Sequence, residues 1–77
     1  TQQPGPQELA ARHEWAERLS DALAALPAEQ REAFVLREEA GLSLAEIAKA
    51  TQVGQETAKS RLRYAVSRLR KALQVSP

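Results

Sequence analysis

Apolar residues recur at helical spacing in four stretches of the chain, separated by short polar or turn-prone segments. The first stretch carries apolar residues three or four apart: Trp15, Leu19, Ala22, Leu23 and Leu26. This spacing predicts an amphipathic helix from about Pro6 or Gln7 to Leu26. Pro27 ends it, because a residue that precedes proline avoids the helical conformation. We expect Trp15 to pack in the core of the domain.

A second helix is predicted after Pro27. Its centre, Ala33-Phe34-Val35-Leu36, has the length and polarity of a strand. The residues on both sides are strong helix formers, however, and they favour a helix throughout. Pro27 suits the first helical position, and Gly41 is expected to take the left-handed conformation directly after the last turn. Leu42 is expected to pack inward as the chain turns.

The stretch from Ser43 to Leu73 has the pattern of a short helix followed by a longer one. Ser43 and Glu46 have the spacing of a capping box, in which a hydroxyl and a carboxylate three residues later cap the start of a helix. From about Gln55 the longer helix runs to Leu73. Its apolar side carries Ala58, Leu62, Ala65, Val66, Leu69, Ala72 and Leu73. We expect Leu62 to be a core residue.

Turn-prone residues separate these two helices and predict a tight corner. Ala48 is small where the two helices would cross, and Val53 is apolar inside the corner. Gln52 stands where such a corner often has glycine, which accepts a positive φ without strain. We therefore expect either Gln52 or Gly54 to accommodate the turn.

The composition supports a fold built of helices. Hydrophobic residues make up 43% of the 77 residues but aromatic ones only 4%, so the core consists mostly of Leu, Ala, Val and Ile. Such a core suits long helices with small contacts better than packed strands. The sequence predicts an all-α, small four-helix domain with a C-terminal helix-turn-helix over residues 7–77. Residues 1–6 are predicted to be a disordered, linker-like tail, and a chain that begins with Thr1 is expected to belong to a longer protein.

Charge is divided unevenly along the chain. Residues 1–48 carry four Arg against nine Asp or Glu, a net charge of −5, whereas residues 49–77 carry seven Lys or Arg against Glu56 alone, a net charge of +6. This asymmetry is expected of a domain that binds a polyanion on one side, although a solvated basic helix gives the same pattern.

The residue types exclude several classes of function. The absence of cysteine and the single histidine exclude a disulfide framework and the usual zinc sites. No apolar run is long enough to span a bilayer, so no membrane partner is expected. The chain offers no nucleophile–base pair, no phosphate-cradling glycine loop and no metal cluster. We therefore expect neither an enzyme nor a cofactor.

The polar side of the last helix carries candidate DNA-binding residues. These are Gln55, Glu56, Lys59, Ser60 and Arg63, which lie opposite Ala58, Leu62 and Val66. Side chains of these types reach base edges or phosphates in a major groove. Only the first two or three turns of the helix can enter a groove. Arg68, Arg70 and Lys71 would therefore lie near phosphates or in solvent.

Three motifs in order resemble region 4 of bacterial RNA polymerase sigma factors, with the extracytoplasmic-function group as the best match. They are LPAEQREAFVLR at 26–37, GLSLAEIA at 41–48 and TAKSRL at 57–62, and the resemblance covers about Leu19 to Leu73. It implies a cytoplasmic domain that reads the −35 promoter element in double-stranded DNA and docks on the β-subunit flap of RNA polymerase. It also implies an anti-sigma factor as a further candidate partner.

Residue roles follow from the resemblance by position. It implies base reading by Lys59, Ser60, Arg63 and Tyr64, backbone contacts by Thr57 and Arg61, and a further DNA contact by Arg37. Two positions depart from the family pattern, because Tyr64 stands where arginine is usual and Glu56 where glycine is common. Glu56 can accept from a cytosine amino group or repel phosphate, and in a first turn it also suits the helix dipole.

Two other classes of function stay open. The output domain of LuxR-type response regulators has a similar Leu-Ser-x-x-Glu-Ile-Ala run, but it usually places histidine two residues after a Thr-Val-Lys-type triplet. Here Thr57-Ala58-Lys59 is followed by Ser60 and Arg61, which favours the sigma factor. A helical protein-interaction module would use the acidic half of the chain without contacting DNA.

Overall fold

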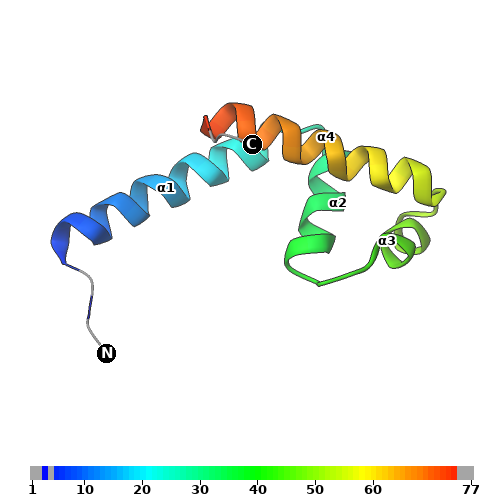
Figure 1. Cartoon of the computed structure of the whole chain (residues 1–77), viewed down its shortest axis with the longest axis horizontal. Coiled ribbons are helices and arrows are strands. Elements are labelled where there is room, and N and C mark those ends of the chain that lie inside the picture. The colour runs from blue at the N-terminus through cyan, green and yellow to red at the C-terminus, as the bar shows by residue number, and fades with distance from the viewer. Residues whose placement is uncertain (1–2, 4, 75–77) are drawn as a thin grey trace.

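A computed structural model of the chain describes residue 3 and residues 5–74. The described residues form four helices: α1 (Pro6–Ala24), α2 (Ala28–Glu38), α3 (Leu44–Thr51) and α4 (Gln55–Leu73). This is the predicted all-α architecture. Figure 1 shows α4 lying across α2 and α3, while α1 runs past the end of α4 and away from the other helices. Residues 1, 2 and 4 of the predicted tail lie outside the described residues, and Pro6 already belongs to α1.

The junction between α1 and α2 is held by one arginine. Arg31 of α2 donates hydrogen bonds to the carbonyl oxygens of Leu23 at 3.0 Å, Ala24 at 3.2 Å and Leu26 at 3.0 Å. Carbonyls at the end of a helix lack the usual helical donor, so the guanidinium satisfies groups that would otherwise need water, apart from the carbonyl of Leu23, which also accepts from the N–H of Leu26 at 3.1 Å. Helix α1 therefore ends at Ala24 rather than at the predicted Leu26, and Pro27 precedes α2 instead of opening it.

The buried side chains form two clusters, one toward each end of α4. The first contains Ala22, Leu26, Ala65, Leu69 and Leu73, with Leu19, Leu23 and Phe34 packed against it. The second contains Ala33, Ile47, Ala48 and Ala58, with Leu36, Leu42 and Val53 packed against it. The predictions that Leu42 and Val53 pack inward and that Ala48 lies at the helix crossing are confirmed.

Trp15 does not lie in the core, so that prediction is wrong. Its side chain is 45% exposed. The last turn of α4 meets α1 at Arg18, whose Nη2 donates to the carbonyl of Leu73 at 3.1 Å. The part of α1 before Arg18 extends beyond α4 and has no described helix to pack against (Figure 1). Trp15 instead carries the guanidinium of Arg18 over its ring, at 5.7 Å from the centroid.

The apolar side of α4 is buried unevenly. Its buried residues are Ala58, Ala65, Leu69 and Leu73. Leu62 and Val66 are only half-buried and Ala72 is exposed, so the prediction of Leu62 as a core residue is wrong. The small side chains of Ala58 and Ala65 allow the neighbouring helices to approach closely. The larger Leu62 and Val66 therefore lie at the edge of the contact.

This packing predicts different costs for two leucine truncations on α4. Leu69→Ala is expected to lower the free energy of unfolding by about 2–5 kcal/mol, because it leaves a cavity in the first cluster. Leu62→Ala is expected to cost only about 1–2 kcal/mol, because much of that side chain already contacts water. Urea unfolding of both variants measures the difference, and equal losses would contradict the uneven burial.

The arginine at the α1–α2 junction predicts a second stability effect. Arg31→Met keeps the aliphatic stem but removes all three hydrogen bonds, and only the carbonyl of Leu23 retains another donor, the N–H of Leu26. The expected loss is about 2 kcal/mol, since each net hydrogen bond contributes roughly 0.5–1.5 kcal/mol. Thermal unfolding measures it, with Arg12→Met as the control, because Arg12 is exposed on α1. If both variants melted at the same temperature, Arg31 would not hold the junction.

Candidate nucleic-acid interface

The short helix α3 begins with the predicted capping box. The Ser43 hydroxyl accepts from the Glu46 N–H at 3.1 Å, and the Glu46 carboxylate accepts from the Ser43 N–H at 2.8 Å. The backbone hydrogen bond from Ser43, with a further contribution from its side chain, lowers the pKa of Glu46 below its ordinary value. The carboxylate is thus charged at neutral pH, as the cap requires, and it fixes where α3 starts.

The corner between α3 and α4 is a Schellman motif with glutamine in the left-handed position. Gln52 has φ 60° and ψ 42°, and Gly54 has φ −71°. The N–H of Val53 donates to the carbonyl of Ala48 at 3.0 Å, and the N–H of Gln52 donates to that of Lys49 at 3.3 Å. Of the two residues considered from the sequence, Gln52 therefore accommodates the turn. These bonds set the direction in which α4 leaves the corner.

The connection between α2 and α3 involves Arg37, a predicted DNA contact. Arg37 lies exposed in the last turn of α2, and its Nη1 donates to the carbonyl of Leu42 at 3.0 Å. Gly41 takes the left-handed conformation, with φ 68°, but it follows the C-cap residue Glu39 by two positions instead of standing directly after the helix. Arg37 thus has a structural role in this loop, and its DNA contact stays a prediction.

Helix α4 presents its positive charge without compensation. Its cations are Lys59, Arg61, Arg63, Arg68, Arg70 and Lys71. Across residues 5–74, the one ion pair joins His13 and Glu17 of α1 at 2.9 Å. None of the α4 cations is neutralised by a carboxylate of the described chain. The helix is therefore suited to an external anion.

The predicted DNA-binding residues of α4 occupy its leading half. Exposed among them are Gln55, Glu56, Thr57, Lys59, Arg63 and Tyr64, whereas Ser60 and Arg61 are half-buried. Because successive residues turn by about 100° around a helix, Lys59, Ser60 and Arg63 point away from the side that buries Ala58 and Ala65. The structure brings these three residues to one side of α4, with Lys59 and Arg63 exposed and Ser60 half-buried. Their individual roles stay predictions.

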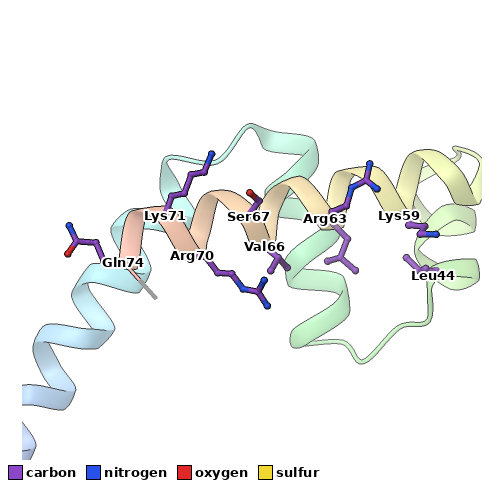
Figure 2. A pocket seen from close by; sticks show the side chains of 9 residues that line it. Leu44, Lys59, Arg63, Val66, Ser67, Arg70, Lys71 and Gln74 are labelled. Atoms are coloured by element: carbon purple, nitrogen blue, oxygen red, sulfur yellow. The ribbon is translucent and has the colours of Figure 1, made fainter. Parts of the chain in front are cut away.

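An apolar groove of about 760 Å³ runs along α4 and was not predicted. Its lining consists of Leu44, Lys59, Leu62, Arg63, Val66, Ser67, Arg70, Lys71 and Gln74. Figure 2 shows Val66 and Arg70 pointing to the side of α4 on which Leu44 lies, whereas Lys71 points the other way. The groove thus combines an apolar floor with cations at its edges.

The sequence contains a signal for this groove. The large apolar residues Leu62 and Val66 stand to one side of the stripe that Ala58 and Ala65 define on α4. A helix that contacts its neighbours through small residues leaves such larger side chains at the margin. The apolar stripe predicted for α4 contains these two residues together with the buried ones.

Neither a membrane span nor a metal cluster is found in the described part of the chain. No helix there is long and apolar enough to cross a membrane. No group of three or more His, Cys, Asp or Glu side chains is placed to hold a metal ion among these residues.

A short capped helix, a left-handed corner and a longer basic helix together form a helix-turn-helix, the architecture of a class of DNA-binding domains. The chain belongs to the family Sigma-70, region 4, whose family model matches residues 22–71, well over half of its length. This is a family of DNA-binding regulatory domains of sigma factors, which act in transcription initiation. The predicted region 4 family is thereby confirmed, and the extracytoplasmic-function group stays a prediction. No curated protein matches the chain at a significant level.

Proposed function

We propose that this domain reads the −35 promoter element for a sigma factor of the extracytoplasmic-function group, in the cytoplasm. The observation that carries the proposal is the pair of exposed, unpaired cations Lys59 and Arg63 on the leading half of α4. The helix-turn-helix presents this half outward, as entry into a major groove requires. The domain acts by binding DNA and protein partners, not by catalysis.

The proposed residue roles are those that the family resemblance implies for the matching positions of this sequence. Lys59, Ser60 and Arg63 face base edges, where lysine and arginine can donate to guanine. Thr57 and Arg61 lie beside the DNA backbone, and Arg37 reaches it from the end of α2. Helix α4 has 19 residues and is about 28 Å long, so its second half extends past the groove.

We also propose that the apolar groove docks the domain on the β-subunit flap of RNA polymerase. Its lining from Val66 onward lies beyond the base-reading turns, whereas Lys59, Leu62 and Arg63 line the end of the groove that adjoins those turns. Half-exposed Leu62 and Val66 offer an apolar floor to a protein partner, and covering this floor removes apolar surface from water, which favours association. An anti-sigma factor that covered this groove would compete with polymerase.

The family match favours a sigma factor over a LuxR-type output domain. A protein-interaction module without DNA contact is separated from both by measurement. Fluorescence anisotropy with labelled duplexes over a salt series should show binding that weakens steeply, with a slope of about −0.9 per neutralised phosphate in log K against log salt. The series is repeated with core polymerase present, so that weak binding by the isolated domain is not mistaken for no binding. If neither series showed salt-dependent binding, the protein-interaction module without DNA contact would be the remaining function.

Substitution of Arg63 tests base reading directly. Arg63→Ala is expected to lose about 1–3 kcal/mol of binding free energy on the preferred duplex and much less on others, because bidentate contact with guanine depends on sequence. Anisotropy against a set of single-base variants measures this. Arg12→Ala on α1 is the control, since it removes the same charge far from α4. Equal losses on every duplex would reassign Arg63 to a phosphate.

Substitution of Val66 tests the docking surface. Val66→Glu places a carboxylate on the apolar floor, so binding to core polymerase is expected to weaken roughly tenfold or more. DNA binding by the domain alone should change far less. Ala10→Glu, at an exposed position on α1, controls for the added charge. Unchanged polymerase binding by the Val66 variant would remove the groove from the proposal.

A further inference from the structure

Arg63 has one partner within the described chain, the ring of its neighbour. Its guanidinium carbon lies 5.5 Å from the ring centroid of Tyr64. No hydrogen bond or ion pair joins Arg63 to any described residue. Figure 2 shows its guanidinium directed toward the edge of α4 opposite Val66 and Leu44, not across the groove. The ring of Tyr64 is 53% exposed, so both groups stand at the surface together.

When a guanidinium lies over an aromatic ring, the face of the guanidinium contacts the ring. Its edge, which carries the N–H donors, stays free. The five N–H donors of arginine lie in the plane of the group, and bidentate contact with guanine requires that edge. Attraction to the ring also restricts a long, flexible side chain before any ligand arrives. Restriction in advance lowers the entropy lost on binding and so strengthens the complex.

We infer that Tyr64 is a positioning residue that holds Arg63 ready for a base. The inference rests on the proposed DNA-reading role of α4 and deepens it. The phenol hydroxyl has no part in this role. The aromatic face is sufficient, and phenylalanine should replace tyrosine.

The stacking is tested first in the free domain by proton NMR. Protons on the side chain of Arg63 should show an upfield ring-current shift that is lost in Tyr64→Ala and kept in Tyr64→Phe. Trp15→Ala is the matched control, because it removes the aromatic partner of the other arginine–ring pair, on α1. That control should leave the Arg63 shifts unchanged. Identical Arg63 shifts in the wild type and Tyr64→Ala would overturn the inference.

Binding to DNA then tests the positioning role. Tyr64→Ala should weaken binding to the preferred duplex about two- to fivefold, the equivalent of an exposed cation–π contact. It should leave the salt slope unchanged, because no charge is removed. Tyr64→Phe should bind like the wild type. In an Arg63→Ala background, the Tyr64→Ala change should have no further effect, since there is no guanidinium left to hold.

Each other outcome has a distinct meaning. A loss that persists in the Arg63→Ala background would show that Tyr64 contacts DNA itself and would overturn the inference. A loss in Tyr64→Phe equal to that in Tyr64→Ala would assign the effect to the hydroxyl and overturn it as well. If the wild type bound DNA and Tyr64→Ala bound it equally well, the inference about Tyr64 would be refuted but the proposed function would not. Absence of salt-dependent binding by the wild type, with and without polymerase, refutes the proposed function first.

Discussion

The close approach of helices through alanine is the contact on which this domain depends. Ala33 of α2 and Ala48 of α3 are buried with Ala58 of α4, and Ala65 is buried one cluster further along the same helix. A methyl group lets two helix backbones come near each other, so short helices with few large apolar residues still hold together. The contact is narrow, however. It fixes α4 along one line and leaves the other sides of the helix open for charge and for partners.

Local rules of helix formation were sufficient to predict the helix-turn-helix. The capping box at Ser43 and Glu46 and the corner at Gln52 act within a few residues of chain, and α4 has the predicted bounds. Contacts between distant residues were not predictable in this way. Periodicity indicates which face of α1 is apolar, but not that α4 ends before it can cover Trp15. The hydrogen bonds from Arg31 to the end of α1 have no sequence signature either. In the sequence, an arginine on α2 that makes such bonds cannot be distinguished from one that does not.

For the candidate site too, local patterns were predictable from the sequence and contacts between distant residues were not. Helical periodicity was enough to place Lys59 and Arg63 on the outer side of α4, and the structure confirms their exposure. It was not enough to distinguish a buried apolar residue from one at the margin of a contact. Leu62 was therefore predicted to be a core residue, although it and Val66 form the floor of a groove. The placement of the Arg63 guanidinium over Tyr64 depends on rotamers, which a residue pattern does not specify.

The continuity of α4 links the two surfaces of the domain mechanically. Residues 59–63 and the groove residues beyond Val66 belong to one uninterrupted helix, so no hinge separates them. One residue inserted between them would add only about 1.5 Å of length but would rotate one surface by about 100° relative to the other. The angle between the two surfaces around the helix axis, rather than the distance between them, is therefore what α4 keeps constant. An insertion in α4 that preserved function would have to add whole helical turns.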